Sequence, residues 1–119
     1  NKDIYYWYEL GLNYSLIGNS VMAEESFFNV FENNDNQFYC KELTALALSN
    51  LCRRQKRFDE AILWAEMAYD LAKDKTYALQ AIANAHLWNQ DIAKAKIFFT
   101  ELQNLVSANT YKYYHRPSI

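Results

Sequence analysis

The sequence has very few of the residues that make tight turns. Its 119 residues include two glycines and one proline, and the proline, Pro117, stands near the end of the chain. β-Hairpins and other tight turns depend on Gly and Pro for their backbone geometry. Because these residues are almost absent from the rest of the chain, the sequence excludes an all-β fold.

The chain also has no large excess of positive or negative charge and no long apolar run. The formal net charge is −2 and the isoelectric point is near 5.6, so the chain lacks the broad basic surface of a nucleic-acid-binding protein. No apolar run approaches the roughly 20 residues that a membrane-spanning helix needs. We therefore expect neither a direct nucleic-acid partner nor membrane insertion.

Cysteine is limited to Cys40 and Cys52, which lack the CxxC spacing of a metal site or redox motif. On one helix with a rise of ~1.5 Å per residue they would stand about 18 Å apart, far beyond disulfide distance. We expect two buried thiols and a cytoplasmic location. The chain opens at Asn1 without an initiating Met or a signal peptide, which indicates a processed chain or a fragment of a longer protein.

Apolar residues, by contrast, are abundant. They make up 51% of the chain, aromatic residues alone account for 17%, and charged residues for 22%. This composition is typical of a folded globular chain, and the length fits one domain with a core of its own. The position of the aromatic rings is therefore the main question that the composition leaves open.

Three stretches of the chain repeat one another. Ala23, Ala61 and Ala95 align at separations of 38 and then 34 residues, within the range of periods that indicates a repeat architecture. The same frame aligns small residues with small and large residues with large. The further rows are Gly11, Ser49 and Ala83; Leu10, Leu48 and Ile82; Tyr14, Cys52 and His86; Phe27, Ala65 and Phe99; and Val30, Ala68 and Leu102.

Each unit carries two stretches of helical periodicity separated by a short break. The breaks fall at residues 18–20, 55–57 and 89–90, and Asn19 or Ser20 is expected to cap the helix that follows the first break. The Asn-rich run at 33–36 closes the first unit. Four extra residues, 38–41, amount to about one helical turn and are expected to lengthen the third helix. The last helix is expected to run from Asp91 to about Leu105.

These units resemble tetratricopeptide (TPR) repeats, which are helix–turn–helix motifs of ~34 residues. The sequence departs from that pattern at Ala45 and Leu79, where an aromatic residue is usual, at Ser49, where glycine is usual, and in lacking a proline at the end of each repeat. The segments that carry the resemblance are residues 7–11 with Tyr14, Gly18, Ala23 and Phe27, and residues 57–61 with Ala65 and Ala68.

The resemblance implies an all-α fold, an α-solenoid of three antiparallel helix–turn–helix repeats in a right-handed superhelix; another kind of α-solenoid is the alternative. The repeats would span about 4–37, about 38–75 with one extra turn, and about 76–108. Residues 109–119, which include Tyr111, Tyr113 and Tyr114, would form a tail or a truncated capping helix. This tail could cap the stack, fold back on the groove, or mediate self-association through a neighbouring molecule.

In a stack of such helix pairs the first helices line a concave surface. In the TPR family this surface binds a protein or peptide partner. Here it would be rich in Tyr, Trp and Leu, and Tyr and Trp dominate interface energetics. The predicted partner-binding residues are Tyr5, Tyr8, Leu12, Leu43, Leu46, Asn50, Arg53, Tyr77, Gln80, Asn84 and Trp88.

Asn50 and Asn84 stand 34 residues apart, in register on this surface. The resemblance implies that they hold the ligand backbone, because an amide both donates and accepts hydrogen bonds; the alternative is that they are ordinary polar surface residues. Chaperone-docking members of the family hold a partner's C-terminal carboxylate with Lys, Asn and Arg, and that binding mode is not expected here. The corresponding positions are Tyr8, Leu12, Ala47, Tyr77 and Ala81.

We expect no catalytic residues, no metal site and no cofactor. His86 falls in a core row and His115 has no partner at metal-ligand spacing, while two glycines cannot build a phosphate loop. The sequence thus predicts a non-catalytic scaffold or adaptor that binds a partner peptide or helix. The alternatives are a small cytoplasmic chaperone of a secreted protein, and a regulatory or oligomerisation domain of a larger protein such as a transcription regulator.

Overall fold

The computed structural model describes the backbone of residues 3–32 and 38–114, and the side chains of residues 3–32 and 39–108. The described part is entirely α-helical, which confirms the predicted all-α class. The Asn-rich run at 33–36 lies outside the described residues. The helices are α1 (Ile4–Leu16), α2 (Ser20–Glu32), α3 (Phe38–Arg54), α4 (Phe58–Leu71), α5 (Thr76–Trp88) and α6 (Ile92–Tyr114).

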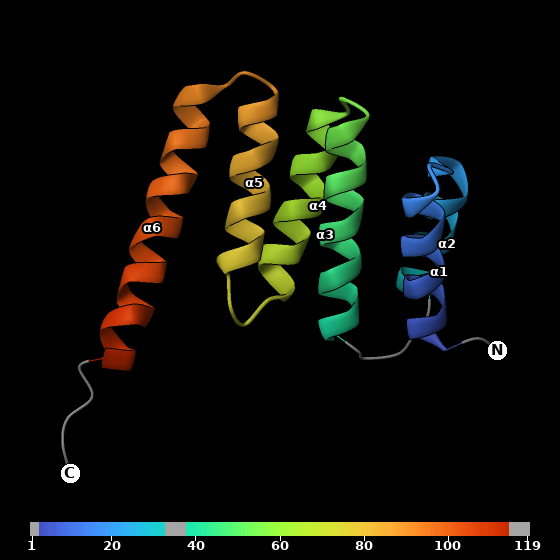
Figure 1. The fold of residues 1–119 in the computed structure, drawn as a ribbon, viewed down its shortest axis with the longest axis horizontal. Coiled ribbons are helices and arrows are strands. Elements are labelled where there is room, and N and C mark those ends of the chain that lie inside the picture. Colours follow the sequence, from blue (N-terminus) through green and yellow to red (C-terminus); the bar gives the residue numbers. More distant parts are fainter. Residues whose placement is uncertain (1–2, 33–37, 115–119) are drawn as a thin grey trace, which may run out of the picture.

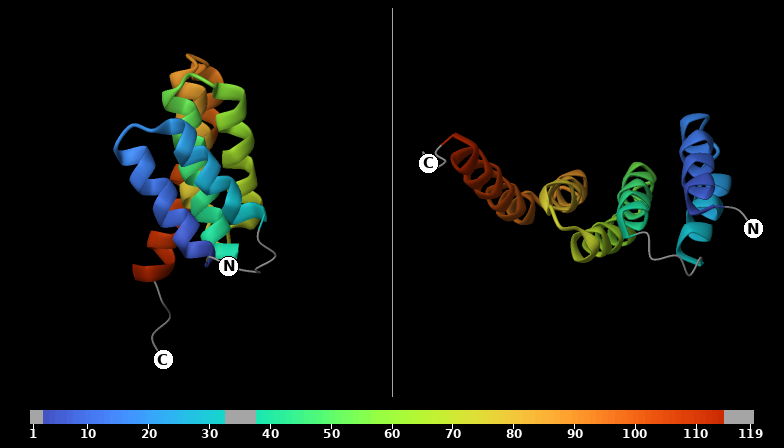
Figure 2. Two further views of the ribbon diagram at one scale, coloured as in Figure 1. Left: turned by 90° about the vertical axis from the view of Figure 1, so that its right-hand side faces the viewer. Right: turned by 90° about the horizontal axis from the view of Figure 1, so that it is seen from below.

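Consecutive helices form pairs, α1 with α2, α3 with α4, and α5 with α6 (Figure 1). The pairs follow one another in chain order, so α1 and α6 lie at opposite ends of a molecule that measures 50 × 40 × 23 Å (Figures 1 and 2). The first helix of each pair also contacts the first helix of the next, α1 with α3 and α3 with α5. One face of the molecule is therefore formed by α1, α3 and α5.

The turn inside each pair has the same geometry. Gly18, Lys56 and Gln90 adopt positive φ angles of 83°, 63° and 64°, and they stand at the same separations as the alanine row. The residue after each donates its backbone N–H to the carbonyl five residues back, which is the bond that closes a helix C-terminus in a Schellman motif. These bonds are Asn19 to Tyr14 at 2.9 Å, Arg57 to Cys52 at 2.8 Å, and Asp91 to His86 at 2.9 Å.

The residue after each positive-φ position directly precedes the next helix and stands at its N-cap position. The Asn19 side chain accepts a hydrogen bond from the Met22 N–H at 3.2 Å, and the Asp91 side chain accepts one from the Lys94 N–H at 3.2 Å. Of the two caps predicted for α2, Asn19 and Ser20, the structure has Asn19. A side-chain oxygen at this position satisfies an N–H that has no partner within the helix.

Arg57 occupies the equivalent place before α4, and its side chain makes no such cap. Its guanidinium instead pairs with Glu60 of α4 and with Glu24 of α2. Hydrogen bonds to Glu60 and Glu24 raise the pKa of Arg57 above its already high ordinary value. Arg57 thus links the first helix pair to the second.

The small-residue rows lie in the core. Ala23, Ala61 and Ala95 are buried, and small side chains at these places let the paired helices approach closely. At Gly11 the approach leaves no room for a side chain, because a Cβ there would stand 2.4 Å from the Phe27 ring. The predicted burial of the alanine row is confirmed.

Aromatic rings fill the space between the first and second pairs. Trp64 of α4 stacks against Phe28 of α2 at 6.0 Å between ring centroids, and its ring lies 5.3 Å from that of Phe31. Trp64 also packs against the buried cluster that contains Ala45, Ala68 and Ala78. A single indole ring thus joins α2 to the core of the second pair.

Two helices differ in length from their counterparts. α3 has 17 residues, whereas α1 and α5 have 13 each, and the extra four stand at its start. α6 runs to Tyr114, so the expected end near Leu105 was wrong. Residues 106–114 contain neither Gly nor Pro, and nothing there ends a helix. The side chains of 109–119, and with them the predicted self-association through the Tyr-rich tail, lie outside the described residues.

Candidate functional site

A groove between α1 and α3 brings five of the predicted partner-binding residues together. Tyr8 and Leu12 come from α1, and Leu43, Leu46 and Asn50 from α3; they line a cavity of about 220 Å³. We call it the α1–α3 groove. Leu43, Leu46 and Asn50 are three or four positions apart, so helical periodicity puts them on one side of α3.

The Tyr8 ring is anchored at the base of this groove. It packs against the buried Phe27 ring at 6.4 Å between centroids, and Phe27 itself lines the groove. Burial raises the pKa of Tyr8, and the nearby carboxylate of Glu9 raises it further. The phenol therefore stays neutral at physiological pH and offers both a flat apolar surface and a hydrogen-bonding hydroxyl.

A second hollow, of about 790 Å³, continues the surface toward α5. Leu43 and Leu46 line both hollows, and Tyr77 of α5 forms part of the second wall together with Tyr39. We call it the α3–α5 pocket. Its polar residues include Glu42, whose pKa is raised mainly by burial and then by the neighbouring charge of Asp74. Groove and pocket adjoin each other because they share Leu43 and Leu46. The lining of the pocket is mainly apolar, whereas that of the groove is polar and apolar in about equal parts.

Arg53 and Trp88 meet near the C-terminal ends of α3 and α5. The guanidinium carbon of Arg53 lies 4.7 Å from the centroid of the Trp88 ring. The Nε atom of Arg53 is buried and has no hydrogen-bond partner among the described residues. Burial, followed by the adjacent charge of Arg54, lowers the pKa of Arg53 from its ordinary value.

Besides Arg53 and Trp88, three predicted residues stand outside the α1–α3 groove and the α3–α5 pocket. Tyr5 in the first turn of α1 and Gln80 on α5 are exposed, and Asn84 is half-buried on α5. Asn50 lines the α1–α3 groove, whereas the hollows described above do not include Asn84. The role of the two asparagines in holding a ligand backbone therefore stays a prediction.

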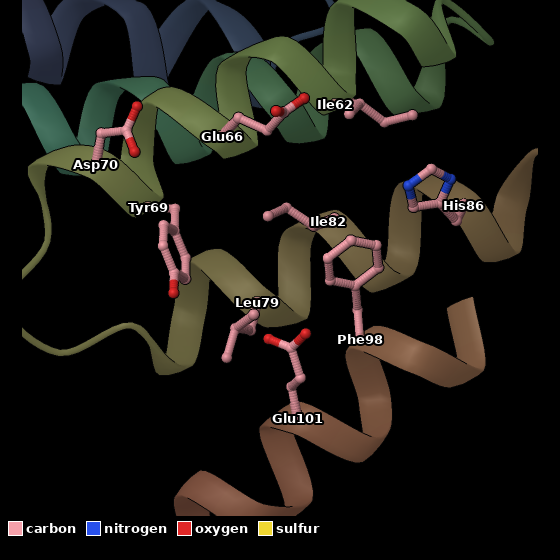
Figure 3. A pocket seen from close by; sticks show the side chains of 9 residues that line it. All are labelled: Ile62, Glu66, Tyr69, Asp70, Leu79, Ile82, His86, Phe98 and Glu101. Carbon is pink, nitrogen blue, oxygen red and sulfur yellow. The ribbon is translucent and has the colours of Figure 1, made fainter. Parts of the chain in front are cut away.

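A further cavity lies between α4, α5 and α6, on the other side of α5 (Figure 3). We call this cavity of about 330 Å³ the back cavity. His86 lines it, is 8% exposed, and stacks on Phe98 at 5.5 Å with the two rings nearly parallel. The lining residues are Ile62, Glu66, Tyr69, Asp70, Leu79, Ile82, His86, Phe98 and Glu101.

Sequence reasoning assigned His86 to the core, and its burial is confirmed. It missed the cavity that His86 faces. The available signal was the pair Glu66 and Asp70, whose spacing of four residues puts both carboxylates on one side of α4. Glu101 belongs to another helix, and only the packing of α6 against α5 brings it to the same cavity.

The start of α6 exposes a large apolar surface. Ile92 is 67% exposed and Ile97 is 58% exposed, while Leu87, Ile92 and Phe99 line a shallow hollow between α5 and α6. Phe99, which the repeat aligns with Phe27, is half-buried. The repeat alignment did not predict the exposed apolar side chains at the start of α6.

Within residues 3–32 and 38–114, no three His, Cys, Asp or Glu side chains are grouped so that they could hold a metal ion. The helices in the described part of the chain are too short or too polar to cross a bilayer. No family model, curated protein or solved structure matches the chain. Function is therefore inferred from the two surfaces on either side of α5.

Proposed function

We propose that the chain is a non-catalytic protein-interaction module that binds a peptide or helical segment of a partner on the face made by α1, α3 and α5. The observation that supports this most strongly is the pair of adjoining hollows, the α1–α3 groove and the α3–α5 pocket. Tyr8, Leu43 and Tyr77 line these hollows from three different helices. A surface of this kind fits apolar anchors of a partner.

The proposed architecture is a right-handed solenoid of three TPR-like helix pairs. Its support is the repetition of one turn geometry at Gly18, Lys56 and Gln90, at the separations of the alanine row. In such an arrangement each pair contacts its neighbours and adds its first helix to a shared binding surface. The contacts of α1 with α3 and of α3 with α5 fit this description.

The proposed binding mode combines apolar burial with a few polar contacts. Leu43 and Leu46 sit between the two hollows, where apolar side chains of the partner would displace water from them. Asn50 at the groove wall would satisfy a peptide unit of the partner, which costs free energy if it is buried without a hydrogen bond.

Affinity capture from the source cell with three matched baits tests this proposal. The first bait is the wild type, and the second carries Tyr8→Ala, Asn84→Ala and Trp88→Ala. The third carries Leu63→Ala, which removes a 65% exposed leucine of α4 outside the groove and the pocket. A partner retained by the first and third baits and lost by the second supports the proposal; equal capture by all three contradicts it.

A further inference from the structure

The back cavity is separate from the proposed partner-binding face. Leu79, Ile82 and His86 line it from α5, whereas Tyr77 of the same helix lines the α3–α5 pocket. Leu79, Ile82 and His86 recur at helical spacing along α5, whereas Tyr77 falls on the other side of that helix. Any ligand of the back cavity would leave the α1, α3 and α5 face free, and the inference below does not rest on the proposed function.

At one end of the back cavity stands an imidazole that makes no hydrogen bond within the described residues. His86 is 8% exposed and its ring stacks on Phe98. Among the described residues none forms a hydrogen bond with the imidazole nitrogens, and the ring borders the open space of the cavity (Figure 3). A neutral imidazole has one nitrogen that accepts a hydrogen bond, so a ligand with an N–H donor would satisfy it.

The rest of the cavity combines apolar walls with acidic side chains. Leu79, Ile82 and Phe98 supply the walls, and Glu101 extends from α6 toward α5 (Figure 3). Glu66 and Asp70 line the cavity from α4, and no Lys or Arg is among the lining residues. Carboxylates of one sign beside low-dielectric walls create a local field that attracts cations.

The lysine beside Tyr69 is already held by the protein. Lys75 donates a hydrogen bond to the Tyr69 carbonyl at 2.5 Å, and its ammonium lies 4.5 Å from the Tyr69 ring centroid. This contact occupies Tyr69 at the end of the cavity away from His86 (Figure 3). The charges of Glu66 and Glu101 are left for a ligand, because the ion pairs of the described residues do not involve them.

We propose that the back cavity binds an organic cation with an apolar stem and an ammonium or guanidinium head. The cationic head would pair with the carboxylate of Glu101, the stem would lie on Leu79, Ile82 and Phe98, and a second N–H donor of the ligand would reach His86 beyond the Phe98 ring (Figure 3). A long cationic side chain has this division between apolar stem and charged end. The volume of about 330 Å³ is adequate for such a ligand.

Two probes represent the two sources of this chemistry. Agmatine, a four-carbon amine with a guanidinium head, stands for a free amine. The blocked peptide acetyl-Gly-Arg-Gly-amide stands for a basic side chain of a polypeptide, and its neutral counterpart with citrulline in place of arginine is the control. Each is titrated into the full chain while the imidazole signals of His86 and the backbone amide signals are followed by NMR.

The expected result is a saturable shift of the His86 ring signals with agmatine or with the arginine peptide. Glu101→Gln, which neutralises an exposed carboxylate, should weaken that binding at least tenfold. Glu25→Gln makes the same change on the exposed side of α2 and should leave it unchanged. Binding of the peptide but not of agmatine would assign the cavity to a basic polypeptide segment.

Three outcomes would overturn the proposal. The first is that neither cationic probe shifts the His86 signals. The second is that the citrulline peptide binds as well as the arginine peptide, since the charge would then be irrelevant. The third is that Glu101→Gln binds agmatine and the peptide as tightly as the wild type does. Circular dichroism of Glu101→Gln verifies that its helices are intact.

Discussion

The guanidinium of Arg53 lies over the ring of Trp88, with its central carbon 4.7 Å from the ring centroid. This contact joins the last turn of α3 to the last residue of α5. Trp88 is 52% exposed, so the indole both holds the arginine and presents a flat apolar surface to solvent. The same residue pair thus contributes to the packing of two helices and to the proposed binding face.

A double-mutant cycle measures the coupling between these two residues. Arg53→Met, Trp88→Leu and the double variant are unfolded in urea and compared with the wild type. We expect a coupling energy of ~0.5–1 kcal/mol, the range of a cation–π contact at a partly exposed site. The same cycle with Arg54→Met in place of Arg53→Met should give no coupling, and equal coupling in both cycles would contradict the assignment.

Gly11→Ala is expected to destabilise the protein. In an exposed part of a helix this change usually stabilises, because Ala has the higher helix propensity. At position 11 the new Cβ would stand 2.4 Å from the Phe27 ring, which is buried and closely packed. We expect the free energy of unfolding to fall by ~1–3 kcal/mol. In the background of Phe27→Leu the same change should cost less, and equal costs in both backgrounds would show that the ring is not responsible.

Lys56→Gly and Gln90→Gly are expected to stabilise the protein. Both residues hold positive φ angles, 63° and 64°, which strain a residue with a Cβ by ~1 kcal/mol and cost glycine nothing. Urea denaturation should show a gain of about 0.5–1 kcal/mol for each. Lys96→Gly, an exposed change inside α6, should instead lose about 1 kcal/mol. A loss at all three positions would contradict the turn geometry.

Cys52 is expected to make stability depend on pH in the alkaline range. Burial raises the pKa of this thiol from 9.0 to about 11. The folded state therefore binds the thiol proton more tightly than the unfolded state does, and this contribution is complete below pH 9 and lost as the pH rises toward 11. The difference in free energy of unfolding between the wild type and Cys52→Ala should narrow over that interval; a constant difference would rule this out.

Much of the helix framework could be predicted because it depends on local signals. The break at residues 18–20 contains a glycine with positive φ and a capping asparagine, and α1 ends and α2 begins there. The alanine row predicted where paired helices approach, and Ala23 and Ala61 are buried. Both features are encoded within a few neighbouring residues, so a single sequence is enough to find them.

Contacts between distant segments could not be predicted in the same way. The departure from glycine at Ser49 has a structural reason, a buried hydrogen bond from its hydroxyl to the Ala61 carbonyl at 2.7 Å. The link from Arg57 to Glu24 joins residues on two different helix pairs. Each depends on side-chain directions that only the assembled fold determines. The same is true of the packing that brings Glu101 and His86 to the lining of one cavity.

The candidate site was predicted in part for the same reason. Helical spacing alone assigns Leu43, Leu46 and Asn50 to one side of α3, and these three line the α1–α3 groove. Which neighbouring side chains complete the hollow depends on how α1 and α5 pack against α3. Tyr39 was therefore missed, although it lines the α3–α5 pocket, because the sequence places it in the extra turn that has no counterpart in the other units.

The affinity of the captured partner for single variants of the α1, α3 and α5 face tests the proposed binding face most directly. Tyr8→Ala and Trp88→Ala are titrated with the purified partner by isothermal titration calorimetry, beside the wild type and Leu63→Ala. If these rings are binding hot spots, the Kd rises at least about 30-fold for one of them, equivalent to ~2 kcal/mol, and stays at the wild-type value for Leu63→Ala. A Kd that is the same for all four proteins would contradict the account.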